Sequence, residues 1–105
     1  MSPARADAVY VGVLECDVLL GAVGSLKHKR AIVRPVLARL RRLDVAATEA
    51  GDPDRHRRAL IAVATVASDP AAVQRVLDTC ERQIVGEVEF EVLSTRRRVV
   101  GAHDE

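Results

Sequence analysis

Hydrophobic and polar positions alternate along residues 8–20. The even positions carry no charge, whereas the odd positions begin apolar and end with Glu15 and Asp17. A period of two residues is typical of a β-strand, because successive side chains point to opposite faces of a sheet. The sequence therefore predicts a strand over residues 8–20 with its even positions, Tyr10 included, facing inward.

The pattern changes to steps of three and four residues over residues 26–43, which predicts an amphipathic helix. Ser25 is a suitable N-cap for it. Pro35 lies inside this segment, where it removes a backbone hydrogen bond and costs about 3 kcal/mol. We expect a kink there or a first turn separated from the rest. The outer face of the helix is basic and carries Lys27, Arg30, Arg34 and Arg41.

The same periodicities predict three further strands and a second helix. Residues 44–49 predict a short strand, and residues 59–67 predict a longer one that is apolar on both faces. Ser68-Asp69-Pro70 supplies a helix cap followed by a first-turn proline. Later, Val88, Phe90 and Val92 alternate with three glutamates and predict a final strand with Phe90 inward. These glutamates are expected to lie near two acidic residues of the first strand and to form a solvated acidic row with them. The row consists of Glu15, Asp17, Glu87, Glu89 and Glu91.

The resulting order of β-α-β-β-α-β predicts an α+β protein, a ferredoxin-like sandwich with a four-stranded antiparallel sheet and two helices on one face. Right-handed crossovers place the first and third strands at the centre. We expect this domain over residues 8–94, a flexible N-terminus over residues 1–7 and a C-terminal extension and tail over residues 95–105. The topology also makes two basic segments neighbours, residues 27–30 and 55–58.

Charge is strongly segregated although the net charge is only +1, since no acidic residue lies between Asp17 and Asp44. The first helical turn carries four cationic or ionisable side chains at the positive end of the helix dipole, which favours anions. One of them, Lys29, projects near the apolar stripe, so its stem must snorkel. Three interpretations stay open for this turn: a phosphate or RNA contact, a solvated face with structural salt bridges, or a protein contact.

The loop over residues 51–58 offers a second basic group that would extend the first. Asp52 and Asp54 lie close enough in sequence to neutralise it, so a structural role is equally open. A surface that binds nucleic acid through phosphates needs such cations, and its affinity falls with salt. The candidate nucleic-acid or anion-binding residues are Lys27, His28, Lys29, Arg30, Arg34, Arg55, His56, Arg57 and Arg58.

The outward face of the sheet is expected to be apolar in part and to mediate a homodimer. Tyr10 and Phe90, the two aromatic residues, are predicted inward, which excludes base stacking on sheet aromatics. The residues predicted for the dimer face are Val9, Val11, Val13, Ile61 and Val63.

Other chemistry is not indicated by the residue spacings. His28, His56 and His103 lack the spacing of metal ligands, and no cofactor motif occurs, since Gly21-x-x-Gly24 is too short for a phosphate loop. Cys16 and Cys80 lie in apolar periodic segments and are expected to be buried and reduced. No apolar stretch is long enough for a membrane span or a signal peptide, so we expect a cytoplasmic protein without membrane contact.

The segment Gly-x-x-Gly-Ser25-Leu26-Lys27-x-Lys29-Arg30, followed by the basic helix and a late Ser-Asp-Pro helix, resembles the YlxP-like family of small bacterial proteins of unknown function. The likeness covers about residues 9–93. It implies a ferredoxin-like fold and a suspected association with RNA or the ribosome. The chain departs from the family in the loop, where Asp52 and His56 stand in place of a histidine and a tryptophan, which marks it as a divergent member.

Together these observations favour a non-catalytic, RNA- or ribosome-associated accessory factor that binds phosphate backbone through the basic helix start and loop. The alternative is a dimeric enzyme or small-molecule-binding protein that uses a cleft on the sheet face. No nucleophile and base occur in a recognisable spacing, which favours the first interpretation.

Overall fold

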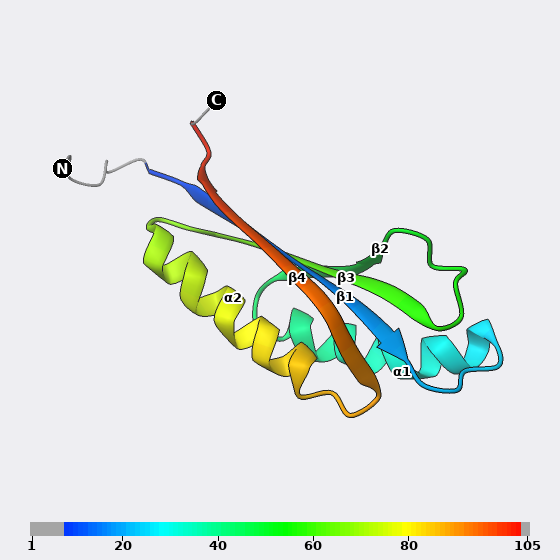
Figure 1. Cartoon of the computed structure of the whole chain (residues 1–105). Coiled ribbons are helices and arrows are strands. Elements are labelled where there is room, and N and C mark those ends of the chain that lie inside the picture. Colours follow the sequence, from blue (N-terminus) through cyan, green and yellow to red (C-terminus); the bar gives the residue numbers. More distant parts are fainter. Residues whose placement is uncertain (1–7, 104–105) are drawn as a thin grey trace.

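A computed structural model of the chain describes residues 8–103. Its six elements are β1 (Tyr10–Leu20), α1 (Leu26–Arg41), β2 (Ala46–Ala50), β3 (Arg58–Ala67), α2 (Pro70–Val85) and β4 (Phe90–Gly101). Both helices lie on one face of a twisted four-stranded sheet (Figure 1). The predicted α+β, ferredoxin-like fold is confirmed.

The sheet has the strand order β2-β3-β1-β4, and all neighbouring strands are antiparallel. The predicted central position of β1 and β3 is therefore confirmed. Leu14 of β1 lies opposite Val63 of β3, and both side chains are buried under the helices. The even residues of β1 face inward as predicted, and they share the core with the odd residues of β3.

The core contains almost only aliphatic side chains, and it requires a glycine where β1 passes under α2. A Cβ atom on Gly12 would lie 2.2 Å from Val73 Cγ1 and 2.9 Å from Leu77 Cδ1. A larger residue there would force the side chains of Val73 and Leu77 to shift. Because Val73 and Leu77 are fully buried, the close approach sets how tightly α2 packs on the sheet.

Helix α1 begins as the sequence predicts, with Ser25 Oγ accepting a hydrogen bond from the His28 backbone N–H at 3.1 Å. It then continues as one helix to Arg41 with Pro35 inside it, so the expectation of a separated first turn was wrong. Pro35 is exposed, whereas Val33 and Val36 on either side of it are buried against the core. Packing of these neighbours offsets the backbone hydrogen bond that proline removes.

The final strand is later and longer than predicted. It begins at Phe90 and runs to Gly101, so residues 95–101 belong to the sheet and the prediction of an extension from residue 95 was wrong there. The segment pairs with β1 along the whole strand, from Leu20 opposite Phe90 to Tyr10 opposite Gly101. The extent of a strand depends on such cross-strand neighbours more than on its own sequence. The predicted flexible residues 1–7 and the last residues of the tail, 104–105, lie outside the described residues.

The open face of the sheet, opposite the helices, is composed differently from the prediction. Ile61 and Val63 are 0% and 1% exposed in the core, because their register partners on β1 face the helices. Their placement on a dimer face was therefore wrong. On the open face, Val11 lies opposite Val66, which is 66% exposed. Val9 and Val13 are also exposed, and homodimerisation through this face stays a prediction.

Candidate functional site

The loop between β2 and β3 is attached to the start of α1 by one buried lysine. Lys29 is 1% exposed, and its Nζ donates hydrogen bonds to the backbone oxygens of Pro53 at 2.9 Å and Arg55 at 2.5 Å. The same ammonium forms an ion pair with Glu49 Oε2 at 2.6 Å, and this oxygen has no other partner within the described residues. The predicted proximity of the two basic segments is confirmed by these contacts.

Lys29 is therefore not a ligand-binding cation, and its assignment to the anion-binding set was wrong. An ammonium has three hydrogens, and here they face two carbonyls and a carboxylate inside the protein. Its stem was expected to snorkel to solvent, but the lysine head is buried as well. The sequence signal was its place on the apolar stripe of α1. Glu49, the partner, carried no such signal.

Two further arginines of the predicted set also have partners within the protein. Arg57 Nε donates to the backbone oxygens of Leu20 at 3.4 Å and Gly21 at 3.1 Å, which ties the far side of the loop to the end of β1. The Arg58 guanidinium binds Asp17 in bidentate fashion, at 3.2 and 2.6 Å. These side chains support the loop and the sheet end.

The remaining candidates form one exposed group, which we call the basic surface. Within residues 8–103 their side chains form no hydrogen bond or ion pair. Three of them, from α1, line a shallow hollow of about 380 Å³ with Ala31 and Pro35. Since α1 contains no acidic residue, its cations lack neutralising partners along the helix. The basic surface consists of Lys27, His28, Arg30, Arg34, Arg55 and His56.

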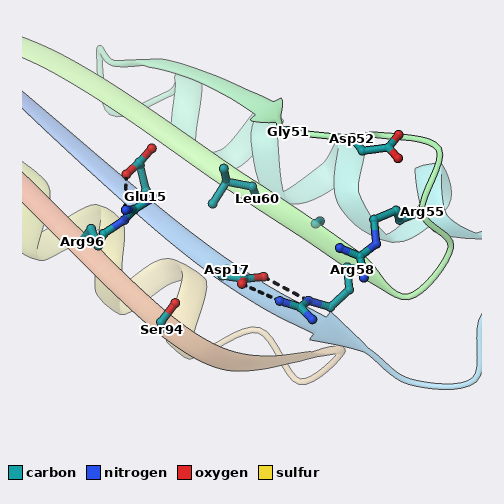
Figure 2. Close-up of a pocket in the computed structure, with 10 residues that line it drawn as sticks. Glu15, Asp17, Gly51, Asp52, Arg55, Arg58, Leu60, Ser94 and Arg96 are labelled. Atoms are coloured by element: carbon teal, nitrogen blue, oxygen red, sulfur yellow. Dashed lines mark hydrogen bonds and ion pairs between the residues drawn. The ribbon is translucent and has the colours of Figure 1, made fainter.

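A second hollow, of about 280 Å³, lies on the open face of the sheet beneath the same loop (Figure 2). The close-up shows Arg55 extending from the loop toward the strand that carries Arg58. Leu60 lies in the middle of the hollow, between the loop and β1. Its lining residues are Glu15, Asp17, Gly51, Asp52, Arg55, Arg58, Ala59, Leu60, Ser94 and Arg96.

The predicted acidic row does not form on this face. Glu15 pairs with Arg96 at 3.2 Å, and Asp17 pairs with Arg58 at 2.6 Å. Glu87 instead lies between α2 and β4, where it pairs with Arg39 of α1. The prediction was wrong because β4 begins only at Phe90, so its register with β1 places Arg96 opposite Glu15 and Ser94 opposite Asp17, while Arg58 of β3 pairs with Asp17.

Electrostatics in the hollow keep one carboxylate ionised. The hydrogen bond from Arg58 lowers the pKa of Asp17 below its usual value, and the charges of Arg58 and Arg55 act in the same direction. Arg58 donates one hydrogen bond to each oxygen of this carboxylate, so each oxygen keeps a lone pair that can accept from a ligand. The hollow thus presents acceptors beside guanidinium donors over an apolar floor.

The two thiols and the histidines do not add a reactive or metal-binding site to this region. Burial raises the pKa of the Cys16 thiol to about 11 and also raises the pKa of Cys80, so both stay protonated and unreactive near neutral pH. Within residues 8–103, His, Cys, Asp and Glu form no group of three suited to a metal ion. In the same residues, neither helix has the length and apolar character that a membrane crossing needs.

Comparison with known proteins gives a family and a fold. The family model described as "Protein of unknown function (DUF503)" matches residues 11–97. The uncharacterized protein YlxP of Bacillus subtilis (strain 168) is 31% identical over 68 residues, which cover 64% of this chain and 74% of that protein. Among solved structures, the de novo designed protein Foldit4 superimposes with a TM-score of 0.51 at 13% identity, covering 92% of this chain and 99% of the design. The last likeness concerns the fold alone.

Proposed function

This chain belongs to the DUF503 family of proteins of unknown function, and from that premise we propose that it binds the phosphate backbone of RNA through the basic surface. The observation that carries the proposal is the use of a buried lysine to hold the loop against α1. Lys29 orders the backbone of Arg55 and so brings exposed cations from two distant segments together. Burying an ammonium is costly because it loses its hydration. Holding exposed cations together for an anionic ligand is a functional reason for such a costly arrangement.

The chemistry of the basic surface fits a polyanion better than a protein partner. Lys27, Arg30 and Arg34 follow one another along one side of α1, where phosphates spaced along a strand can bind in succession. Guanidinium groups match phosphate geometry with two donors each. The open face offers no exposed aromatic side chain within the described residues, as Phe90 is buried and Tyr10 packs against the core. Contact through the backbone is therefore the expected mode.

The resemblance to the YlxP-like family supports ribosomal RNA as the natural target, and the role would be that of a non-catalytic accessory factor. Such a factor needs moderate affinity and strong salt dependence, because phosphate contacts release counterions. The triple variant Lys27→Ala/Arg30→Ala/Arg34→Ala tests this assignment directly. A matched control, Arg42→Ala/Arg75→Ala/Arg98→Ala, removes the same charge from exposed arginines outside the basic surface.

The measurement is fluorescence anisotropy with a short hairpin RNA, and sedimentation with small ribosomal subunits, between about 50 and 200 mM salt. Wild type is expected to bind with an affinity that falls steeply with salt. In the triple variant, the slope of the logarithm of the binding constant against the logarithm of the salt concentration should decrease by about 2 to 3, from about 0.7 to 0.9 per lost phosphate contact. Absent or salt-insensitive binding by the wild type, or equal weakening in both triple variants, would overturn the proposal.

A further inference from the structure

The hollow on the open face shares Arg55 with the basic surface and therefore continues it. Arg55 lines the hollow, while its backbone oxygen is held by Lys29 and its backbone N–H donates to Asp52 O at 3.4 Å. Within the described residues its guanidinium forms no hydrogen bond or ion pair. An arginine with an anchored backbone and an unpaired head is preorganised for a ligand that carries a phosphate.

The groups deeper in the hollow call for a ligand that also carries hydrogen-bond donors. Asp17 uses one side of its carboxylate on Arg58, and Glu15 contacts Arg96 through Oε2. Each carboxylate keeps lone pairs that these contacts do not use, and the Ser94 hydroxyl, opposite Asp17 in the strand register, has no partner within the described residues. A ligand that carries only a phosphate would leave these acceptors without donors. A phosphate linked to a donor-rich, flat group satisfies both halves of the site.

We propose that this hollow binds one unpaired nucleotide of the RNA, with its phosphate on Arg55 and its base edge on Asp17, and that guanine is the preferred base. The inference rests on the proposed function and names the part of the RNA that the open face recognises. RNA-binding proteins commonly recognise the bases of single-stranded segments through hydrogen bonds to the Watson–Crick edges of those bases.

Guanine is favoured because of the order of its polar groups. Its N1–H and N2–H₂ donors lie side by side and suit two neighbouring acceptors, an Asp17 lone pair that Arg58 leaves unused and the hydroxyl oxygen of Ser94, the residue opposite Asp17 on β4. Its O6 and N7 atoms can accept from an arginine. Uracil has one such N–H donor between two carbonyls, and those carbonyls would face the carboxylates. Leu60 supplies an apolar floor for the ring. The volume of about 280 Å³ suits one nucleotide, being near the lower limit of ligand pockets, about 300 Å³.

The test compares oligouridines that carry one central guanosine, adenosine or cytidine with plain oligouridine, by fluorescence anisotropy at one salt concentration. The readout is the ratio of affinities, which a change of net charge leaves unaltered because it acts on all four strands. For wild type we expect the guanosine strand to bind about fivefold or more tightly than plain oligouridine, the lower limit for one bidentate base contact.

Asp17→Asn replaces an acceptor by an amide donor and is expected to bring the ratio close to one. Its matched control is Asp78→Asn, which also removes a carboxylate lying 2.6 Å from an arginine, Arg97, but on the helix side of the sheet. The control should keep the wild-type ratio. Ser94→Leu, on the exposed edge strand, is the second variant, and it should abolish the preference by filling the hollow while the salt slope stays unchanged.

The outcomes separate this inference from the proposed function. Equal affinity for all four strands, or a preference that survives both Asp17→Asn and Ser94→Leu, would overturn the guanine site and leave backbone binding intact. If wild type binds no RNA but guanosine monophosphate shifts the amide resonances of Leu60 and Ser94, the nucleotide site stands and RNA binding is overturned. If neither probe binds, both are overturned.

Discussion

The Lys29 ammonium on α1 and the Glu49 carboxylate on β2 form an ion pair of 2.6 Å with side-chain exposures of 1% and 15%. Taking such charges out of water is costly, and the pair is tolerated only because the remaining lysine hydrogens have acceptors as well. Those acceptors are loop carbonyls. The pair therefore links the first helix, the edge strand and the loop into one unit, and the loop can present its cations in one place.

We expect Lys29→Ala to lower the free energy of unfolding by about 3 kcal/mol, because it leaves Glu49 buried without its counter-charge. The measurement is urea unfolding followed by circular dichroism. The double variant Lys29→Met/Glu49→Leu should recover much of the loss, since removing both charges leaves none uncompensated. Lys27→Ala, at an exposed position two residues earlier in the same helix, should change the free energy of unfolding by no more than about 0.5 kcal/mol. A double variant no more stable than Lys29→Ala would contradict this account.

Gly12→Ala is expected to destabilise the protein by about 1–3 kcal/mol, the usual cost of overpacking a core. Its new Cβ would collide with Val73 Cγ1 at 2.2 Å. Gly24→Ala is the matched control, because no atom lies within 4 Å of a Cβ there. Thermal unfolding of both variants measures the difference. Adding Val73→Ala to Gly12→Ala should cost less than the sum of the two single changes, as expected for residues in contact.

The pKa of Asp17 is expected to rise toward its usual 3.8 in the variant Arg58→Ala, because the hydrogen bond that favours the ionised form is removed. A carboxyl with a lowered folded pKa adds stability above its unfolded pKa and loses it as the pH falls through the folded value. Wild type should therefore lose this contribution below pH 3.8, and Arg58→Ala should not. Carbon NMR of the carboxyl follows the titration; an unchanged pKa would show that Arg58 is not the cause.

Cys16 should resist alkylation by iodoacetamide at pH 8 in the folded protein and react readily after unfolding. Its folded pKa of about 11, against 9.0 for an unperturbed thiol, also has a consequence for stability. Because the pKa is raised in the folded state, the contribution of this thiol to the free energy of unfolding is fully present below the unfolded pKa. It declines as the pH rises toward the folded pKa. Unfolding between pH 9 and about 11 should show this decline in wild type, and Cys16→Ala should show less of it.

Much of the architecture was predictable because it depends on local periodicity. The inward even face of β1, the caps at Ser25 and Asp69, and the order of the elements follow from residue spacing, and the structure confirms each. The errors arose where spacing is ambiguous. A strand that is apolar on both faces, like residues 59–67, does not reveal which face is inward, and Ile61 and Val63 were assigned to the wrong one. The extent of β4 likewise depends on a partner strand.

For the candidate site, the sequence alone determined which cations exist, that α1 lacks acids to neutralise them, and that the topology brings residues 27–30 and 55–58 to the same end of the sheet. Only the tertiary structure decided which of them are available. Lys29, Arg57 and Arg58 found acceptors on segments remote in sequence, whereas Lys27, Arg30 and Arg55 did not. The reason is physical: whether a charge is a structural group or a ligand-binding one depends on the partners within a few ångströms, and long-range packing sets those partners.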